Sequence, residues 1–348
     1  MQFPSSLPPA RIPDPLKAPV LRWGILGPGW IAQRFVTSLQ KSTRQDITAV
    51  GDVSLAGAQA FADRFGIKKA YGSSEELVQD AEIDVVYIST PHPFHFPCAL
   101  LAIQAGKHVL IEKPLALNAA EVSRLRDEAK KKKVFLMEAM WTWFLPKFDV
   151  LNQVLEDKVI GDVHSIIADH GEHFTPEHRI MRADLAGGPL LDLGSYPVAF
   201  ATKILGPARK VLASGQIAPS GVNGQASIIL SHDGDNQSSI HTTLFSHTPG
   251  SAVIAGTEGY IFLEGMFYTP GSFHIYNNDK RVVTYEEPKF SYDQLFYEAV
   301  HLAYSVGEGL LESPVRPLSD TLMTMEVIDD VRRQLGIVFN EERNGGRH

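Results

Sequence analysis

The sequence has little of several features, and each shortage excludes a class of protein. Its 348 residues include one cysteine, Cys98, so no disulfide can form within the chain. No apolar run approaches the roughly 20 residues that a membrane-spanning helix needs. Positive charge is not in excess, because the formal net charge is −8, which disfavours nucleic acid and anionic membranes as partners. We therefore expect a cytoplasmic protein that acts on a small molecule.

Proline is concentrated at the start of the chain. Residues 1–19 contain six prolines and no hydrophobic segment, so they predict an extended arm rather than a signal peptide. The length of the remainder favours two domains. The predicted boundaries are an arm at 1–19, a nucleotide-binding domain at 20–142, a substrate-binding and oligomerisation domain at 143–338, and a tail at 339–348.

The most informative segment runs from Leu21 to Asp52. An apolar strand, LRWGIL, leads into GPGWIA, in which Gly27, Gly29 and Ala32 have G-x-G-x-x-A spacing. An amphipathic helix and a second strand that ends at Asp52 follow. Gly27 permits a tight turn, Gly29 lets the backbone approach a pyrophosphate, and Ala32 keeps the helix close to the strand. Strand, glycine turn, helix and acid in this order predict a dinucleotide site.

Asp52 also favours NAD over NADP. Its carboxylate can accept hydrogen bonds from the ribose hydroxyls and would repel a 2′-phosphate. The residues that follow, Val53 and Ser54, offer no guanidinium to such a phosphate. The alternative is that Asp52 caps the next helix, a position for which Ser54 is equally suited.

The chain then changes from one fold pattern to another. Strands and helices alternate up to about Met140, which predicts a doubly wound Rossmann domain with a parallel sheet. Short alternating strands dominate from Asp162 to about Tyr285, interrupted by one long helical stretch over 190–205. They predict an α/β domain with a large, open, mostly antiparallel sheet. Two helices, near 292–311 and 318–335, close the chain.

Two clusters carry residues suited to chemistry. Lys113 follows the fifth strand, and strand ends of such a sheet face the cofactor, so its ammonium could stabilise charge on a substrate oxygen. Taken alone, Lys113 would be interpreted as a surface lysine before a proline turn. Asp192 and Tyr196 are four residues apart and would share one helix face. A neighbouring lysine would lower the pKa of a tyrosine and make it a better proton acceptor. Pro197 predicts a kink in that helix.

Several motifs together resemble the glucose–fructose oxidoreductase, inositol dehydrogenase and rhizopine catabolism (Gfo/Idh/MocA) family. The resemblance implies a Rossmann domain, a second domain whose open sheet often forms a homodimer or homotetramer, and hydride transfer between a nicotinamide and a sugar, polyol or related alcohol. It covers nearly everything after the arm, and its motifs are GPGWIA with Asp52, STPHPFH (89–95), AGKHVLIEKP (105–114), MEAMW (137–141), GGPLLDLGSY (187–196), VIAGTEGYI (253–261) and SDTLMTMEVIDDVRRQLG (319–336).

The resemblance also assigns residues. Lys113 matches the catalytic lysine and Asp192 the family aspartate, whereas Tyr196 stands where many members have histidine. That exchange resembles the dimeric dihydrodiol dehydrogenase and glucose–fructose oxidoreductase branches, which usually carry arginine in place of Trp143 and usually prefer NADP. Expected cofactor contacts are Gly27, Gly29, Trp30, Ile31, Asp52, Thr90, Pro91, His92, His95, Glu112, Lys113 and Trp141. Expected substrate contacts are Lys113, His173, Arg179, Arg182, Asp192 and Tyr196.

Some of these residues have a second interpretation. His92 and His95 either line the nicotinamide cleft or cap the next helix. His173, Arg179 and Arg182 could be ordinary polar residues at the rim of the sheet. Trp141 and Trp143 could wall the cleft or pack in the core at the domain junction. The histidines near residue 170 do not predict a metal site, since His170 and His173 face opposite sides of a strand.

Two other functions are compatible with the same fold. One is an NAD-dependent glycosidase of this superfamily, which oxidises its sugar transiently and returns the hydride. The other is a non-catalytic sensor of a sugar or nucleotide. The presence of Lys113, Asp192 and Tyr196 together argues against a sensor, because a sensor needs no proton transfer.

Overall fold

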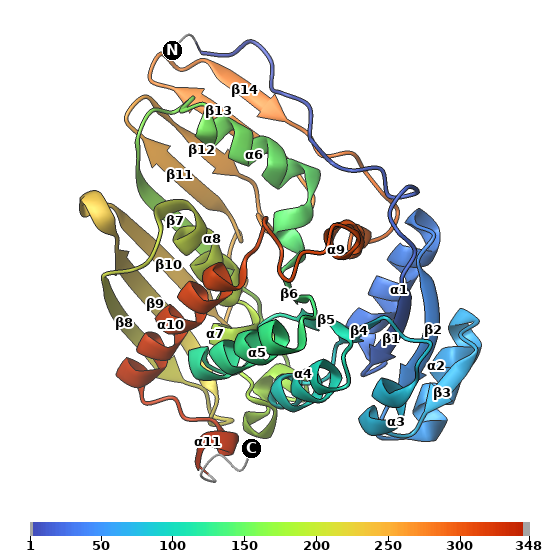
Figure 1. Cartoon of the computed structure of the whole chain (residues 1–348). Helices are drawn as coiled ribbons and strands as arrows, with labels where there is room; N and C mark the ends of the chain where they lie inside the picture. The colour runs from blue at the N-terminus through green and yellow to red at the C-terminus, as the bar shows by residue number, and fades with distance from the viewer. Residues whose placement is uncertain (1–2, 344–348) are drawn as a thin grey trace. The chain divides into compact units, whose positions relative to one another are not determined.

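A computed structural model describes residues 3–343 of the chain (Figure 1). The chain divides into two compact units. The first contains Pro13–Phe144 and Phe290–Thr321, and the second contains Leu145–Lys289 with the described residues before Pro13 and after Thr321. The helix that starts at Phe296 therefore belongs to the first unit, although it follows the second unit's strands in the sequence.

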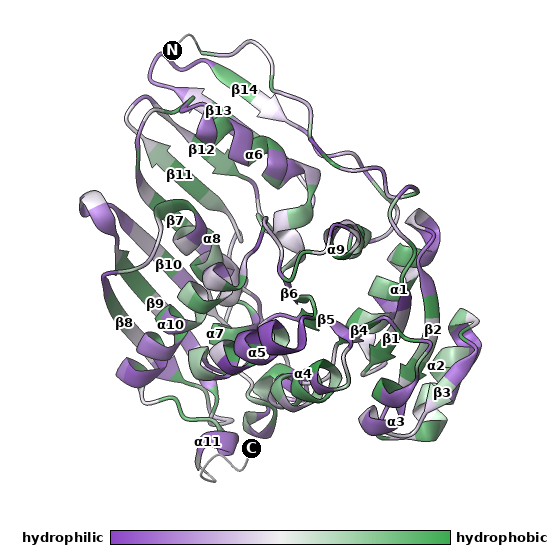
Figure 2. Cartoon of the chain, in the orientation of Figure 1, coloured by the Kyte–Doolittle hydropathy of each residue, from purple (hydrophilic) through white to green (hydrophobic). Residues whose placement is uncertain are grey.

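The first unit is built on a parallel sheet. Its six strands are ordered β3-β2-β1-β4-β5-β6, the doubly wound arrangement that the strand–helix alternation predicts. Strands β4 and β6 are buried along their whole length, as a sheet covered on both faces requires. In Figure 2, β1 is mostly green, or hydrophobic, whereas helix α5 is largely purple, or hydrophilic. The strands are β1 (Arg22–Leu26), β2 (Asp46–Gly51), β3 (Lys69–Tyr71), β4 (Val85–Ile88), β5 (His108–Glu112) and β6 (Leu136–Ala139).

Three helices of this unit begin at a residue whose side chain caps them. Ser54, Ser73 and Asn118 each accept a hydrogen bond from the backbone N–H three residues on, which satisfies an otherwise unpaired donor of the first turn. The helices are α1 (Trp30–Ser42), α2 (Leu55–Phe65), α3 (Ser74–Gln79), η1 (His92–Phe94), α4 (His95–Gln104), α5 (Ala119–Lys132), η2 (Trp141–Phe144) and α9 (Phe296–Gly307).

The second unit is built on an eight-stranded sheet ordered β14-β13-β12-β11-β7-β10-β9-β8. Every neighbouring pair is antiparallel except β7 and β10, so the predicted open, mostly antiparallel sheet is confirmed. The strands are β7 (Val163–Gly171), β8 (Lys210–Ile217), β9 (Asn223–Ser231), β10 (Gln237–Thr243), β11 (Ala252–Gly256), β12 (Gly259–Leu263), β13 (Phe273–Asn277) and β14 (Val282–Tyr285).

Helix α8 packs against β7 and β10 on one face of this sheet. The opposite face carries an apolar row, because Leu212, Ile229 and Ile167 follow one another across paired strands with Ser239 between them. These three apolar side chains are 40–59% exposed. The helices of the unit are α6 (Pro146–Glu156), η3 (Arg179–Met181), η4 (Ala183–Leu185), α7 (Pro189–Asp192), α8 (Ser195–Leu205), η5 (Asp233–Asp235), α10 (Leu318–Leu335) and α11 (Asn340–Arg343).

The described part of the N-terminal arm has no helix or strand before β1. Arg11 of the arm pairs with Asp149 of α6 at 2.9 Å. Within residues 3–343, no helix combines the length and the apolar character needed to cross a bilayer. Residues 1–2 of the predicted arm and 344–348 of the predicted tail lie outside the described residues.

Candidate active site

The turn between β1 and α1 requires glycine at its first position. Gly27 has a φ of +84°, and a Cβ there would lie 2.8 Å from the backbone nitrogen of Thr90. A side chain would therefore be strained and would clash with backbone at the carboxyl end of β4. Gly27 brings the ends of β1 and β4 close together, at the point where the strand order reverses and ligands of such sheets bind.

Gly29 is glycine for a different reason. Its φ of −79° suits any residue, and a Cβ built there meets no atom within 4 Å. The open space lies at the start of α1, which has no side-chain cap and no acidic residue in its first turn. The first N–H groups of a helix lack partners inside it and carry partial positive charge. An open glycine beside an uncapped helix start fits the pyrophosphate of a dinucleotide.

Asp52 follows β2 and does not cap α2. The cap is Ser54, whose Oγ accepts from the N–H of Gly57 at 3.2 Å, so the alternative interpretation of Asp52 is wrong. Asp52 Oδ1 instead accepts from the N–H of Val53 at 2.8 Å. Val53 is 96% exposed and offers no group that would bind a phosphate. The second carboxylate oxygen of Asp52 can accept a hydrogen bond from a ribose hydroxyl.

The histidines after β4 are buried, at 6% exposure for His92 and 1% for His95. Both ring nitrogens of His95 lie 2.8 Å from backbone carbonyl oxygens, those of Thr90 and Pro114. His95 therefore ties the turn after β4 to the chain just beyond Lys113. His95 is the first residue of α4 and not its cap. Linking two backbone segments is therefore a structural role that the sequence did not suggest for it.

Lys113 follows β5 directly and is half-buried. The preceding residue, Glu112, accepts from the Tyr87 hydroxyl at 2.5 Å and from the backbone N–H of Lys113 at 3.3 Å. Tyr87 lies in β4, so this carboxylate connects the ends of two adjacent strands. The backbone position of the lysine is set by these contacts.

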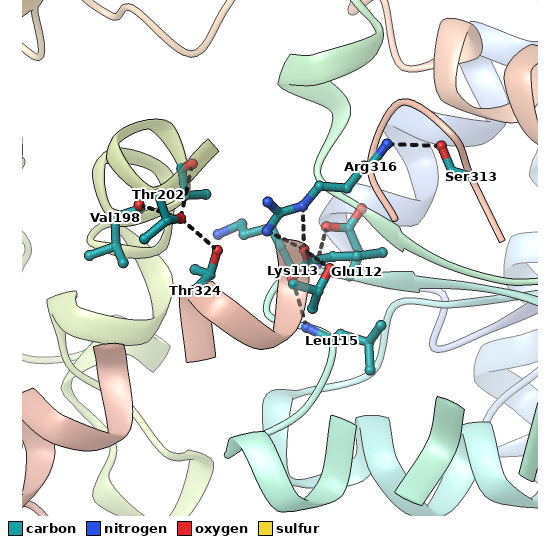
Figure 3. A network of polar contacts seen from close by, with 11 residues as sticks. Glu112, Lys113, Leu115, Val198, Thr202, Ser313, Arg316 and Thr324 are labelled. Atoms are coloured by element: carbon teal, nitrogen blue, oxygen red, sulfur yellow. Dashed lines mark hydrogen bonds and ion pairs between the residues drawn. The ribbon is translucent and has the colours of Figure 1, made fainter. Parts of the chain in front are cut away.

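A buried ion pair fixes the other side of the same loop. Glu138 of β6 accepts from the backbone N–H of Leu115 at 3.1 Å, from Nη2 of Arg316 at 3.0 Å and from the Thr321 hydroxyl at 2.9 Å. Glu138 and Arg316 are 1% and 0% exposed. Figure 3 shows Arg316 reaching toward this cluster, with its backbone held by Ser313. The sequence placed Glu138 inside the MEAMW motif but gave it no role.

A second buried acid lies in the same unit. Glu298 in the first turn of α9 is 0% exposed. Burial, with a smaller contribution from the negative charge of Glu112, raises the pKa of Glu298 well above its ordinary value. Nothing in the local sequence distinguishes Glu298 from an exposed helical glutamate.

In the second unit, Asp192 and Tyr196 lie on different helices. Asp192 ends α7 and Tyr196 is the second residue of α8, with Leu193 and Gly194 between them. The prediction of one helix through 190–205 is wrong for this reason. The break precedes Pro197, which lies in the first turn of α8, where a missing N–H costs no hydrogen bond. Both Asp192 and Tyr196 are buried, at 6% and 8% exposure.

Tyr196 packs within a cluster of polar rings. Its ring stacks on that of Tyr268, with centroids 4.2 Å apart and planes at 20°. The ring of His170 lies 4.4 Å from that of Tyr268 and 5.9 Å from that of Tyr196. Neither Tyr268 nor His170 was among the predicted site residues. Tyr268 belongs to no recognised motif, and His170 was considered only as a metal ligand.

The predicted substrate contacts differ in placement. Arg179 pairs with Asp192 at 2.9 Å, and its side chain is 51% exposed, so these two residues are brought together. Arg182 pairs with Asp184 instead. His173 is exposed and lies beyond β7, which ends at Gly171, so the prediction that His170 and His173 share a strand is wrong.

The remaining expected contacts are also located. Trp30 is 67% exposed, with the guanidinium of Arg34 stacked 4.3 Å from its ring. Trp141 and Trp143 are 9% and 3% exposed, which favours core packing over a cleft wall. Pro91 is exposed, whereas Ile31 and Thr90 are half-buried. No group of three or more His, Cys, Asp or Glu residues able to hold a metal ion occurs among residues 3–343.

Lys113 belongs to the first unit, and Asp192 and Tyr196 belong to the second. Each unit thus contributes its own candidate site residues. The first has the open turn at Gly29, the carboxylate of Asp52 and a firmly anchored Lys113. The second has the buried Asp192 and Tyr196. The dinucleotide elements fit the group that the sequence predicts.

Comparison with known proteins gives the family. A sequence model of the oxidoreductase family with an NAD-binding Rossmann fold (GFO/IDH/MocA) matches residues 21–140, and one of the GFO/IDH/MocA C-terminal domain matches residues 148–262. The trans-1,2-dihydrobenzene-1,2-diol dehydrogenases of Xenopus tropicalis and Mus musculus are both similar, at 36% identity. The matches cover 91% and 93% of this chain and 99% of each relative.

Solved structures agree with these matches. KijD10, a 3-ketoreductase from Actinomadura kijaniata in complex with NADP and TDP-benzene, is 26% identical with a TM-score of 0.81, over 90% of this chain and 97% of that one. An aldose-aldose oxidoreductase from Caulobacter crescentus shares the fold, with 21% identity, a TM-score of 0.82, and coverage of 91% and 98%. The chain therefore belongs to the Gfo/Idh/MocA family and is an oxidoreductase with an NAD-binding Rossmann fold.

Proposed function

We propose that this oxidoreductase transfers hydride between a secondary alcohol and NAD, and that the alcohol is a trans-dihydrodiol or a sugar or polyol that presents similar vicinal hydroxyls. The dihydrodiol is favoured because the relatives that match nearly the whole chain are named for that substrate. The observation that carries the proposal is that a chain of this family has both an open dinucleotide turn at Gly29 and a buried tyrosine, Tyr196.

The roles of the three site residues follow from their chemistry. NAD, when bound, supplies the hydride acceptor. Tyr196 takes the proton of the substrate hydroxyl, Lys113 hydrogen-bonds the reacting oxygen, and Asp192 orients the substrate with Arg179 as its ion-pair partner. In support, similar solved structures of KijD10 include a lysine variant and a tyrosine variant. The two replaced positions are 84 apart in that sequence, and Lys113 and Tyr196 are 83 apart here.

Substitution of these residues tests the roles. Replacing Lys113 with alanine, or Tyr196 with phenylalanine, should reduce kcat by about a hundredfold or more, in the range of general acid–base groups, while cofactor binding stays measurable. The matched controls are Lys132→Ala and Tyr276→Phe. A loss smaller than about tenfold with the trans-dihydrodiol would remove the residue from the mechanism. His173 is the competing candidate for the proton acceptor. If His173→Ala is inactive while Tyr196→Phe is active, the proton acceptor is His173 and not Tyr196.

Asp52 decides the cofactor in this proposal. Because Ser54 already caps α2, the carboxylate of Asp52 is kept for the ribose, and a 2′-phosphate would be repelled. NAD should therefore bind more tightly than NADP, even though the solved complex of KijD10 contains NADP. Asp52→Ala should narrow the difference in affinity between NAD and NADP, and combining it with Val53→Arg should favour NADP. Fluorescence titration of the wild-type protein with both cofactors checks this, and equal or tighter binding of NADP would contradict it.

The exposed apolar row of the second unit supports association into a homodimer or homotetramer. Leu212, Ile229 and Ile167 lie in one row across a face of the sheet, with Ser239 between the last two, and are 40–59% exposed. An exposed apolar patch on a sheet often marks a protein interface. Ile229→Lys should lower the mass measured by sedimentation, whereas Val338→Lys, at another exposed apolar position, should not. A monomeric wild-type protein would contradict this proposal.

The cytoplasmic location stays a prediction.

A further inference from the structure

His170 is a buried polar residue that the proposed function does not use. It lies near the end of β7 and is 2% exposed. Its Nδ1 lies 3.2 Å from the carbonyl oxygen of Leu193, in the link between α7 and α8. A carbonyl can only accept, so Nδ1 carries a hydrogen and donates it. The tautomer of the neutral ring is thereby set, with the lone pair on Nε2.

Two groups compete for that second nitrogen. His170 Nε2 lies 3.0 Å from Oε1 of Glu172 and 2.9 Å from the hydroxyl of Tyr268. A bare Nε2 and a carboxylate would present lone pairs to each other, so a proton must lie between them. The hydrogen bond from His170 holds the pKa of Glu172 below its usual range. His170 and Glu172 therefore share one mobile proton, and Glu172 is the more exposed of the two at 34%.

Tyr268 contacts both this pair and the proposed proton acceptor, Tyr196. Its ring stacks on Tyr196, and its hydroxyl reaches His170. Burial raises the pKa of Tyr268 well above its ordinary value, so its hydroxyl stays protonated. A neutral phenol can still transmit a proton, because it accepts one on oxygen while it donates its own.

The turn that carries Tyr268 is itself anchored. The ammonium of Lys147, which is 0% exposed, donates to the carbonyl oxygen of Phe267 at 2.9 Å and to that of Thr269. These carbonyls flank Tyr268 in sequence. The cluster is therefore a fixed arrangement of the second unit and not a chance contact of a mobile loop.

We propose that Tyr268, His170 and Glu172 form the path by which the proton collected by Tyr196 leaves for solvent. The inference rests on the proposed function, in which alcohol oxidation releases a hydride to the bound cofactor and a proton to Tyr196. That proton must leave before the next turnover, and Tyr196 is only 8% exposed. An exit path is therefore needed.

The transfer balances in three steps. The proton shared by His170 and Glu172 passes from the Glu172 carboxylate to water. Nε2 of His170 then takes the hydroxyl hydrogen of Tyr268 as Tyr268 takes that of Tyr196. The result is one proton delivered from the substrate hydroxyl to solvent, with every residue back in its initial state. Other ionisable groups near the path are Asp192 and Arg179, which pair with each other, and His178 and His247, which interact electrostatically with Glu172.

Kinetics of single and multiple turnovers test this path. The substrate is trans-1,2-dihydrobenzene-1,2-diol, or the sugar or polyol that the wild-type enzyme oxidises fastest. Tyr268→Phe, His170→Phe and Glu172→Gln keep ring or side-chain shape and remove the transferable proton. Each should leave the first burst of reduced cofactor intact but lower steady-state kcat by about tenfold or more, with KM little changed and a larger solvent deuterium isotope effect.

Two controls separate a proton path from a packing role. His170→Ala should be rescued by added imidazole, whereas a purely structural loss would lower the melting temperature and show no rescue. His241→Phe, on the neighbouring strand β10 and hydrogen-bonded to Ser227, should leave kcat and the isotope effect unchanged.

The outcomes separate this inference from the proposed function. If Tyr196→Phe is inactive while Tyr268→Phe and His170→Phe keep wild-type kcat and isotope effect, the path is wrong and the proposed function stands. If the path variants lose stability and raise KM without a change in the isotope effect, the path is likewise overturned. If Tyr196→Phe retains full turnover, or the wild-type enzyme oxidises no member of the substrate panel, both are overturned.

Discussion

Replacing Glu138 with alanine should destabilise the first unit more than any surface substitution in it. Glu138 accepts hydrogen bonds from Leu115, from two nitrogens of Arg316 and from Thr321. Its removal leaves the Arg316 guanidinium, which is 0% exposed, without its carboxylate. Removing one partner of a buried ion pair costs about 3–5 kcal/mol. Single domains are stable by only about 5–15 kcal/mol, so we expect a large fraction of the stability of this unit to be lost.

The assay can be confined to that unit. All four tryptophans of the chain, Trp23, Trp30, Trp141 and Trp143, lie within Pro13–Phe144. Tryptophan fluorescence during urea unfolding therefore reports on the first unit without contribution from the second. The midpoint and slope of that transition give the change in the free energy of unfolding.

Two variants make the result specific. Glu128→Ala breaks the exposed pair with Lys131, 3.3 Å apart on α5, and should cost less than about 1 kcal/mol. Glu138→Leu combined with Arg316→Met removes both charges and should recover most of the loss, because a buried pair contributes little over apolar packing. If Glu138→Ala lies within about 1 kcal/mol of wild type, like the control, the reasoning about this ion pair is refuted.

Two further predictions concern pH and the glycine turn. Burial raises the pKa of Glu287 from 4.5 to about 7, so between these pH values the folded chain holds a proton that the unfolded chain has lost. The free energy of unfolding should fall by up to about 3 kcal/mol as pH rises through this window; Glu287→Gln should remove that slope and Glu286→Gln should keep it, as measured by circular dichroism. Gly29→Ala should unfold like wild type yet bind NAD more weakly, whereas Gly27→Ala should lower stability by about 1–3 kcal/mol; equal unfolding midpoints for the two would contradict this.

Much of the first unit follows from the sequence because its signals are local. The apolar strand before Gly27, the helix after it and the acid at Asp52 are set by short-range sterics and periodicity. The structure confirms the doubly wound parallel sheet, and Ser54 rather than Asp52 caps the helix that follows. Sequence reasoning placed the helix break at Pro197, whereas it lies at Leu193 and Gly194, because a proline is tolerated in a first helical turn.

The contacts that complete each cluster were decided only by tertiary packing. Tyr268 meets His170 across 98 positions of sequence, and Arg316 meets Glu138 across 178. No local pattern encodes such a pair, since its energy depends on two distant segments being buried against each other. The sequence placed His170 and His173 on one strand, whereas β7 ends at Gly171, and no local pattern showed that the ring of His170 lies near that of Tyr196. The sequence alone therefore determined the family and the dinucleotide turn and identified the candidates for the reactive side chains, whereas tertiary burial decided which polar groups surround those candidates.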